Sequence, residues 1–395
     1  MTGGDKPYRV YRGGRTKGKV PLQKRPGRPT ARSKPDGAAP RYPGPGPVRP
    51  ERRQSRRRWI GIALLVLLFL FIVWAVASYL SVRSGVGAAN KRLPASAAAA
   101  LTHQNSLLLS TPTDILLLGT DHAQSSGRQT DQHSDSIMLI RTDPSRHRVS
   151  YLSIPRDLRV PIAGIGDSKV NAAMQSGGPA LAIKTIQSYI GLPINHVIVA
   201  DFSQFRDVID ALGGITVNVP ERIVSKFDCP YPTNTRCARW AGWHFHKGPQ
   251  HMDGKHALIY SRVRKNALNP ADSDITRTGR QQQVLQAMLG KMTSVWTLVQ
   301  LPFIGGQLVR PLATDLSPLQ MMQIGWVYKR AHALHCRLGG AQETLPDGES
   351  VIVPEGDDKT RVILAMLGKT APLPPRPGEG PYGAGCVSGN ASFPR

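Results

Sequence analysis

The stretches that decide the fold are DILLLGTD at 114–121, SIMLIRTD at 136–143 and RVSYLSIPRD at 148–157. Each stretch mixes β-branched and aliphatic residues and is bounded by turn residues, a pattern typical of buried strands. A turn at 143–145, Asp-Pro-Ser, joins the second stretch to the third. The three stretches therefore predict strands of one buried sheet.

Helical and extended patterns are intermixed through the rest of the chain. We expect Ser203 to be the N-cap of a helix at 203–214 and Gly213 to lie at its end. The order of elements predicts one α/β domain with a mostly buried central sheet. Further strands are predicted at 196–202, 215–220 and 348–354, a long loop at 221–250, and helices at 180–189, 203–214, 253–264, 276–293, within 315–335 from near Ser317, and at 360–367.

The first 58 residues are strongly basic. They carry 18 Lys or Arg against three acidic residues, and so supply most of the formal net charge of +25. They are rich in Pro and Gly and lack aliphatic runs. Such a segment cannot bury enough apolar surface to offset its chain entropy, so we predict that it is disordered.

An uncharged run follows, WIGIALLVLLFLFIVWAVASYLSV at 59–82. It exceeds the ~20 residues that cross a bilayer core. Five arginines at 52–58 flank its N-terminal end, whereas only Arg83 lies close beyond the other end. Because positive charge stays on the inner side, the pattern predicts a cytoplasmic N-terminus and an extracellular remainder.

These observations divide the chain into segments. We expect a single-pass protein of the cell membrane, with the basic tail in contact with lipid headgroups rather than a specific nucleic acid. The expected segments are a cytoplasmic tail at 1–58, a transmembrane helix at 59–82, an extracellular stalk at 83–112, a catalytic domain at 113–370 and a Pro/Gly-rich tail at 371–395.

All four cysteines lie on the side predicted to be extracellular, where disulfides are permitted. Cys229 and Cys237 are eight residues apart in a loop and form a natural local pair, which leaves Cys336 to pair with Cys386. Four cysteines allow three connectivities, and this is the preferred one. A zinc site is the alternative, but the spacings do not match the common zinc patterns.

Carboxylates and arginines suggest a phosphate site. Asp121 and Asp157 follow predicted strands and Asp135 precedes one. A pair of carboxylates suits Mg²⁺, which usually takes one or two of them together with substrate phosphate oxygens. The planar guanidinium of arginine matches phosphate oxygens in bidentate fashion. The dense arginines are Arg156, Arg262, Arg264, Arg277 and Arg280.

Spacing groups these arginines further. In an extended segment Arg262 and Arg264 would point the same way. In a helix Arg277, Arg280 and Gln281 share one face. Any one of these residues alone is more often an ordinary surface residue, so the hypothesis depends on the combination.

At these residues the sequence resembles the LytR-CpsA-Psr family. The matching motifs occur in the family's order and cover about 113–295. They are DILLLGTD at 114–121, HSDSIMLI at 133–140, LSIPRD at 152–157, KVNAAMQSGG at 169–178, DALGGITVNVP at 210–220, MDGKHALIYSRVR at 252–264 and DITRTGRQQQ at 274–283.

The resemblance implies a three-layer α/β/α domain with a central mixed sheet and an apolar tunnel for a lipid. It also implies a phosphotransferase that moves a glycopolymer from a polyprenyl-pyrophosphate carrier to the 6-hydroxyl of N-acetylmuramic acid in peptidoglycan, forming a phosphodiester. The polymer would be a teichoic acid, a capsule or an arabinogalactan. Rival hypotheses are a hydrolase of the same pyrophosphates and an envelope-linked transcriptional regulator.

The resemblance also implies roles for single residues. Asp121 and Asp135 correspond to Mg²⁺ ligands. The implied catalytic set also includes Arg156, Arg262 and Arg264, and the implied substrate-binding set is Arg277, Arg280 and Gln281.

His133 departs from the family, which usually has arginine at this position. A neutral histidine offers one donor and no permanent charge, so phosphate binding would weaken or depend on pH. Arg128, in the same loop, is expected to compensate. For the lipid tunnel, candidates are Val284, Met288 and Met292 and the helix at 180–190, although an ordinary core role is the commoner one for such residues.

Overall fold

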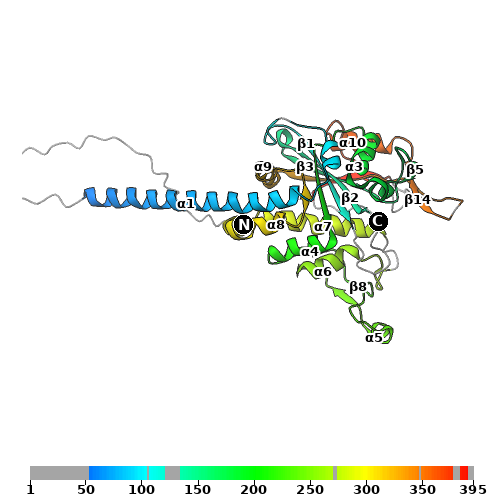
Figure 1. Ribbon diagram of the computed structural model, residues 1–395. Coiled ribbons are helices and arrows are strands. Elements are labelled where there is room, and N and C mark those ends of the chain that lie inside the picture. The colour runs from blue at the N-terminus through cyan, green and yellow to red at the C-terminus, as the bar shows by residue number, and fades with distance from the viewer. Residues whose placement is uncertain are drawn as a thin grey trace, which may run out of the picture. The chain divides into compact units, whose positions relative to one another are not determined.

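The computed structural model describes residues 53–104, 106–120, 134–269, 274–346, 348–376 and 383–389 (Figure 1). Within them, the largest sheet has seven strands. In pairing order these are β11 (Ala313–Thr314), β6 (His196–Asp201), β1 (Thr113–Thr120), β2 (Ser134–Asp143), β3 (Arg148–Ile154), β12 (His332–Arg337) and β15 (Gly385–Ser388).

The sheet is mixed, as the sequence predicts. β1 is parallel to β6, and β3 is parallel to β12. β2 is antiparallel to both β1 and β3, and a short 3₁₀ turn at Pro144–Arg146 joins it to β3. The stretches at 114–121, 136–143 and 148–157 therefore form the adjacent central strands β1, β2 and β3.

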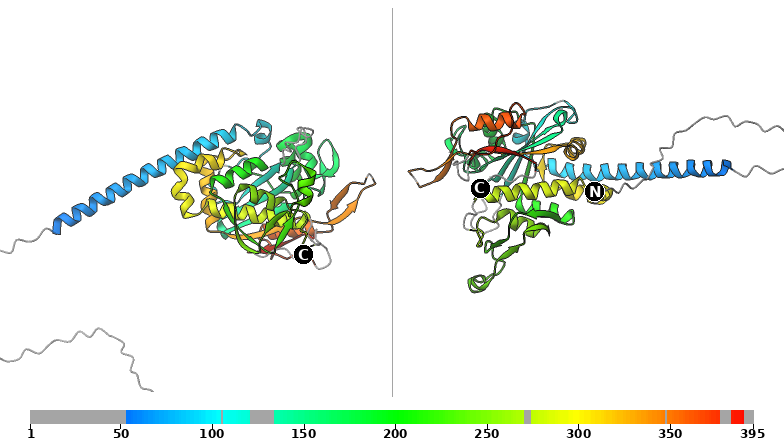
Figure 2. Two further views of the ribbon diagram at one scale, coloured as in Figure 1. Left: turned by 90° about the horizontal axis from the view of Figure 1, so that it is seen from below. Right: turned by 180° about the vertical axis from the view of Figure 1, so that it is seen from behind.

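Helices cover both faces of this sheet (Figures 1 and 2). On one face, Leu116 and Leu139 pack into a core with α2 (Ala95–Ala99), α3 (Val170–Ile190) and α10 (Asp358–Met366). On the other face, Met138 packs with Leu285 of α7 (Asp274–Met292), and α9 (Pro318–Lys329) lies along the same side. The expected three-layer α/β/α fold is confirmed.

A smaller lobe lies between β6 and α7 in the chain. Its elements pack around a second core that includes Phe245, Tyr260 and Val284. The expected loop at 221–250 is wrong, because this segment supplies a strand pair and a short helix. The elements are α4 (Phe202–Ala211), β7 (Ile215–Val219), β8 (Ile223–Ser225), α5 (Asn234–Arg239), β9 (Trp243–Phe245), β10 (Gly248–Met252) and α6 (Gly254–Arg262).

Several other elements were not predicted. β12 begins only three residues after α9, so the segment 315–335 is not all helix. β15 lies in the Pro/Gly-rich tail and forms because it pairs with β12. Also unpredicted are α8 (Val295–Val309), the hairpin of β4 (Arg159–Ile162) and β5 (Gly166–Lys169), and β13 (Ala341–Thr344). β13 pairs with β14 (Ser350–Val353), which confirms the strand predicted at 348–354.

Three residues that the sequence places at helix ends can be compared with the structure. Ser317 caps α9, with the Gln320 side chain completing a capping box. Gly213 follows α4 with φ +71°, as expected for a helix end. Ser203 is not an N-cap, because β6 passes directly into a helix that begins at Phe202 and contains Ser203.

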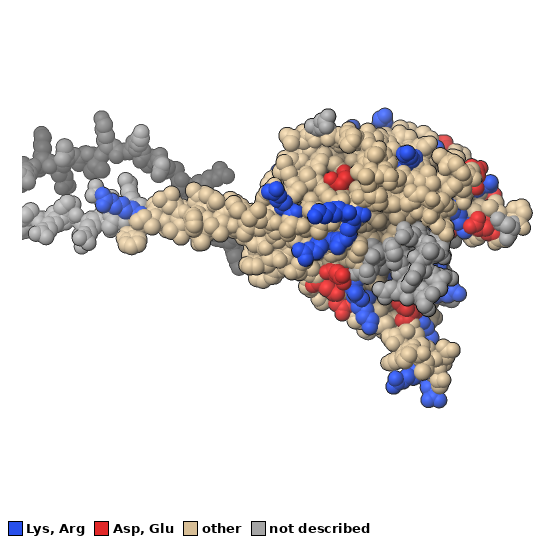
Figure 3. Space-filling model, viewed as in Figure 1, with Lys and Arg blue, Asp and Glu red and all other residues tan. Residues whose placement is uncertain are grey.

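A long helix, α1 (Arg53–Asn90), contains the predicted membrane-spanning run. Among the described residues, α1 is the one helix that is both long enough and apolar enough to cross a membrane. Its large side chains lie exposed, as in Leu67 at 61% and Phe69 at 65%. On the face in Figure 3, no charged residue interrupts α1 between its basic start and the folded domain. These features indicate a membrane-anchored protein.

The segment expected to be a stalk is packed rather than free. α1 continues to Asn90, and its Val86 and Ala89 are buried. Ala97 of α2 is fully buried in the main core, and Leu108 is only 1% exposed. Small and apolar residues of the predicted stalk at 83–112 therefore belong to the folded domain.

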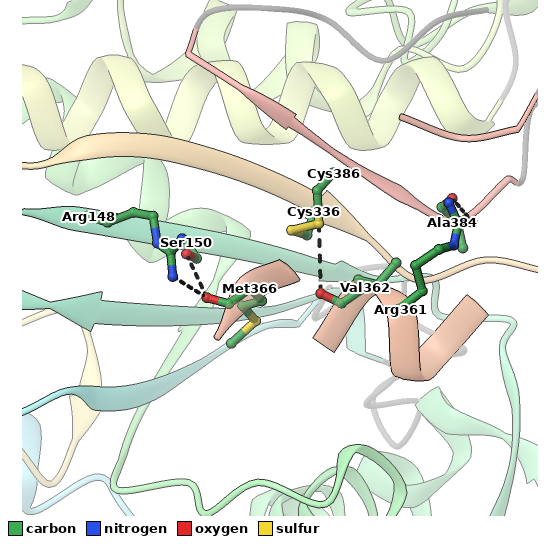
Figure 4. The surroundings of a disulfide bond; sticks show 8 residues. All are labelled: Arg148, Ser150, Cys336, Arg361, Val362, Met366, Ala384 and Cys386. Carbon is green, nitrogen blue, oxygen red and sulfur yellow. Dashed lines mark hydrogen bonds between the residues drawn. A yellow bond between two sulfur atoms is a disulfide. The ribbon is translucent and has the colours of Figure 1, made fainter. Parts of the chain in front are cut away.

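Both predicted disulfides are present, Cys229–Cys237 and Cys336–Cys386. Cys336 and Cys386 are directly opposite each other in β12 and β15. Figure 4 shows this bond beside α10, where the Cys386 sulfur contacts the carbonyl oxygen of Val362 at 3.8 Å. The bond therefore fixes the C-terminal strand to the edge of the sheet.

Candidate functional site

The strand ends that carry the predicted carboxylates meet at one edge of the sheet. β1, β3 and β6 run in the same direction and end at Thr120, Ile154 and Asp201, and β2 begins at this edge with Ser134. Asp121 directly follows Thr120 in the chain, and Arg156 lies two residues after Ile154. The topology therefore gathers the ends of three consecutive sequence motifs, at 114–121, 133–140 and 152–157, beside the end of β6.

Asp135 is the extra residue of a β-bulge at this edge. Gly119 pairs with Ser136 and Thr120 pairs with Ser134, so one residue of β2 has no counterpart in β1. Such bulges bend a strand and re-aim a side chain, and they are common beside active sites. The bulge thus distinguishes the backbone of Asp135 from that of its neighbours.

A pocket opens beside these strand ends, between the sheet, α4, α6 and α7. Three small residues lie side by side across its floor, because Gly119 of β1 pairs with Ala200 of β6 on one side and with Ser136 of β2 on the other. A Cβ on Gly119 would lie 3.1 Å from the Cβ of Ser136, so the two strands approach closely here. The full lining is Leu117, Gly119, Ser136, Met138, Ala200, Phe205, Ser261, Gln281 and Leu285.

The pocket changes character along its length. Leu117 pairs with Met138, two residues farther from the strand ends than the pair of Gly119 and Ser136. On α7, Leu285 lies one turn beyond Gln281. The strands and the helix therefore run in the same sense from small or polar residues to large apolar ones, which suits a ligand with a polar head and an apolar chain.

α7 places two of the predicted arginines in the interior. Arg277 and Arg280 are only 7% and 4% exposed. Nη1 of Arg280 donates to the carbonyl oxygen of Val263 at 2.8 Å and to the hydroxyl of Thr276 at 3.4 Å. Arg280 thus holds the turn that follows α6.

Arg262 and Arg264 flank that turn. Arg262 is the last residue of α6, and the backbone leaves the helical conformation at Val263, so the two arginines are not an extended pair. The Arg262 guanidinium lies 3.6 Å from the Asp228 carboxylate and 5.2 Å from the centre of the Phe227 ring. Arg264 is exposed. The smaller lobe therefore positions Arg262.

Arg156 belongs to a charged cluster on the loop after β3. Its Nε lies 3.4 Å from the Asp157 carboxylate, which also contacts Lys169 at 3.3 Å. Lys169 in turn contacts Glu349 at 3.1 Å. Arg156 is half-buried and is held at the same edge of the sheet as β1 and β2.

α7 is also fastened to the sheet beneath the site. Nε2 of Gln286 lies 2.5 Å from Nε2 of His335, and the His335 ring stacks on Tyr151 with 5.1 Å between ring centres. Burial lowers the pKa of His335 to about 4. The imidazole is therefore neutral near pH 7 and serves as a packed anchor for the helix.

Some predicted site residues lie outside the described residues. These are Asp121, Arg128 and His133, and the same holds for the side chain of Asp135. Of the described members of the substrate-binding set, Gln281 alone lines the pocket. Arg277 and Arg280 lie one turn or less before it on α7.

The tunnel candidates lie in the hydrophobic cores and do not line this pocket. Val284 is fully buried in the core of the smaller lobe, and Ile183 and Ile186 of α3 lie in the main core on the opposite face of the sheet. Met288 packs in the cores around α7 and does not line the pocket. The sequence did carry an indication of the pocket floor, because Gly119 and Ser136 are small residues within strands of otherwise bulky residues.

Comparison with known proteins agrees with this architecture. The LytR_cpsA_psr family model matches residues 79–359. The polyisoprenyl-teichoic acid–peptidoglycan teichoic acid transferase TagV of Bacillus subtilis is 30% identical over 220 residues, which are 55% of this chain and 53% of that protein. TagU of Bacillus mycoides, which carries the same transferase name, is 34% identical over 222 residues, 56% of this chain and 66% of TagU. The chain thus matches about half to two thirds of the length of these curated relatives.

Solved structures give the same result. The crystal structure of B. subtilis TagV superposes with a TM-score of 0.53 at 28% identity, covering 66% of this chain and 97% of that one. A structure of TagT bound to LIIa-WTA superposes with a TM-score of 0.53 at 26% identity, covering 67% of this chain and 93% of that one.

Proposed function

The chain belongs to the LytR-CpsA-Psr family, and we propose from this premise that it is a glycopolymer–peptidoglycan phosphotransferase. The donor would be a glycopolymer on a polyprenyl-pyrophosphate carrier, and the acceptor the 6-hydroxyl of N-acetylmuramic acid. The names of TagV and TagU, which are transferases of teichoic acid to peptidoglycan, support this reading. We further propose that the N-terminus is cytoplasmic and the domain extracellular, because the arginines precede the membrane run.

The observation that carries the proposal is the graded pocket. Its apolar end, at Leu117, Met138 and Leu285, suits the lipid chain of the donor. Its polar end, at Ser136 and Gln281, lies at the strand ends where the charged motifs meet. A polyprenyl pyrophosphate has the same division into apolar chain and polar head.

The arginines around the polar end of the pocket would stabilise the negative charge of the pyrophosphate. We propose that Arg156 and Arg262 contact the pyrophosphate, with Arg264 and Arg277 contributing from the turn after α6 and from α7. Preorganised cationic donors stabilise the charge that develops on the transferred phosphoryl group and the leaving phosphate. Arg280 would contact the pyrophosphate less directly, because its guanidinium already donates to the Val263 carbonyl oxygen.

The donor set at the strand ends also fits Mg²⁺. Asp135 lies in the bulge opposite Gly119 and Thr120, and Asp121 directly follows Thr120 in the chain. Two carboxylates from adjacent strand ends match the usual protein contribution to a Mg²⁺ site. When bound, Mg²⁺ would neutralise phosphate charge.

Transfer then needs a base for the acceptor. The hydroxyl oxygen of the sugar attacks the sugar-linked phosphorus, the bond to the bridging oxygen breaks, and polyprenyl phosphate leaves. The hydroxyl proton passes to a carboxylate at this edge, for which Asp135 and Asp157 are the candidates. Arg156 and Lys169 hold Asp157 in place.

Product analysis tests the proposal. The full chain in liposomes would receive a labelled glycopolymer on a polyprenyl pyrophosphate, with and without peptidoglycan and with and without EDTA. We expect label in peptidoglycan, lost with EDTA and in Arg156→Ala and Arg262→Ala. Lys184→Ala is the matched control, since this exposed cation lies on α3 across the sheet from the pocket.

Two outcomes contradict the proposal. Release of free phosphorylated polymer in the presence of peptidoglycan would favour a hydrolase. Full transfer by both arginine variants would show that Arg156 and Arg262 do not belong to the phosphate-binding site.

A further inference from the structure

Helix α8 exposes an apolar stripe. Val295, Trp296, Val299 and Phe303 are 68%, 64%, 53% and 80% exposed, and their spacing places them along one side of the helix. The opposite side, which includes Gly305 and Leu308, is buried. The chain has no charged residue between Lys291 and Arg310. An uncharged helix with a continuous apolar stripe is costly in water and calls for a partner.

This stripe lies beside the membrane helix. Nε1 of Trp74 donates to the carbonyl oxygen of Val299 at 3.1 Å, and the backbone N–H of Gly306 donates to the hydroxyl of Ser81 at 3.0 Å. Both pairs are separated by 225 residues, so α8 runs parallel to α1 and in step with it. Ile62 and all later residues, which include both contact regions, belong to one compact unit.

The two helices meet through small residues. A Cβ on Gly85 would lie 2.6 Å from the carbonyl oxygen of Gly306, and one on Gly305 would lie 2.8 Å from Val82. Close approach through glycines is the usual way in which helices pack within membranes. The exposed stripe of α8 is therefore held in a fixed relation to the surface of α1.

The length of the uncharged run in α1 determines the depth of this contact relative to the bilayer. The uncharged run begins at Trp59, directly after Arg58, and ~20 helical residues, which cross the hydrocarbon core, end near Ser78. Trp74, which contacts Val299, lies before that point. By the same offset Val295 is level with Leu70, about four residues or ~6 Å deeper along the helix.

We propose that α8 is a second membrane-embedded element, whose N-terminal half inserts into the leaflet on the side of the folded domain. The partner of its exposed stripe is then the lipid bilayer, because the stripe is continuous with α1 and shares its depth. This inference depends on the membrane anchor and is independent of the proposed transferase activity.

The surroundings of α8 fit an interfacial position. Arg83 and Arg310 are exposed just beyond the apolar parts of α1 and α8. α9 exposes Trp326 (54%), and the Arg330 guanidinium stacks 3.9 Å from the centre of its ring. Paired tryptophan and arginine side chains are typical of the boundary between lipid and water. Figures 1 and 2 show α8 and α9 at the end of the domain that α1 leaves.

The insertion would also bring the pocket close to the bilayer. α7 leads from the pocket residue Leu285 to Met292, and Val295 begins α8 three residues later. Seven helical residues span ~10 Å. A lipid chain therefore has a short path along α7 between the leaflet and the apolar end of the pocket.

Depth-resolved quenching tests the proposal on the full chain. All four native cysteines are paired, so a single introduced cysteine carries the label. An environment-sensitive fluorophore would be placed at Trp296→Cys or Phe303→Cys in liposomes containing lipids with nitroxides at known depths. Ile165→Cys is the matched control, because Ile165 is a 46% exposed apolar residue in the β4–β5 turn, at the end of the domain away from α1 (Figure 1).

We expect the labels on α8 to be quenched several-fold more strongly than the control label. The Trp296→Cys label should respond to deeper nitroxides than the Phe303→Cys label, since α8 and α1 run in the same direction. Water-like emission equal to that of the control overturns the proposal. Blue-shifted emission without lipid quenching also overturns it, because a protein partner then covers the stripe.

Discussion

The guanidinium of Arg280 donates a 2.8 Å hydrogen bond to the carbonyl oxygen of Val263. This bond joins the first turns of α7 to the turn between Arg262 and Arg264. α7 also supplies Gln281 and Leu285 to the pocket. One buried contact therefore ties the phosphate-binding candidates of the smaller lobe to the helix that lines the pocket.

Arg280→Ala should lower the free energy of unfolding by about 1–3 kcal/mol, because it removes a buried charged donor from a carbonyl oxygen. Transfer should fall as well, since Arg262 and Arg264 lose their support. Chemical denaturation of the detergent-solubilised chain measures the first effect and the liposome assay the second. Gln281→Ala is the control, and should change stability by no more than ~0.5 kcal/mol while weakening transfer. Unchanged stability of Arg280→Ala would refute the anchoring role.

Ala200→Leu should block the pocket. Ala200 is 8% exposed and lies at the floor beside Gly119, so a larger side chain would occupy space that the lipid chain needs. We expect a large rise in the KM for the lipid-linked donor, measured by initial rates in mixed micelles. Ala238→Leu on α5 is a matched change at an exposed position and should leave KM unchanged. An unchanged KM in Ala200→Leu would place the lipid chain elsewhere.

The two disulfides should differ in their effect on stability. Cys336 and Cys386 are 50 residues apart, whereas Cys229 and Cys237 are eight apart. Loop-closure entropy then predicts a loss of about 4 kcal/mol for the first pair and about 2.5 kcal/mol for the second when both cysteines become alanine. Denaturation of the two double variants measures the difference. The reverse order would show that loop entropy does not govern these bonds.

His335 should make stability depend on pH. Burial lowers its pKa to about 4, below the 6.5 of the unfolded chain, so the unfolded state binds a proton first as the pH falls. The contribution is fully present above pH 6.5 and is lost as the pH falls towards 4, by about 3 kcal/mol in total. His335→Phe keeps a ring against Tyr151 and should flatten this part of the stability–pH curve. An equal slope in wild type and variant between pH 6.5 and 4 would contradict the prediction.

The sequence predicted the local elements well where a pattern repeats within one element. Runs of β-branched and aliphatic residues between turn residues identified β1, β2 and β3, and apolar spacing identified α7. Ser317 marked the start of α9. The smaller lobe was missed at 221–250, because β8 and β9 are three residues long and form only when paired. α8 was missed because its apolar residues lie on nearly all sides, which gives no amphipathic pattern.

What the sequence determined by itself was a membrane-anchored α/β protein of the LytR-CpsA-Psr family, with local motifs for a phosphate site and a preferred cysteine pairing. Each of these depends on residues close together in the chain or on motif order. The tertiary structure alone decided that Ala200, Gly119 and Ser136 lie side by side in the pocket floor, that Arg280 supports the turn after α6, and that α8 lies against α1. These relations depend on strand register and helix packing between distant segments, which local propensity does not encode.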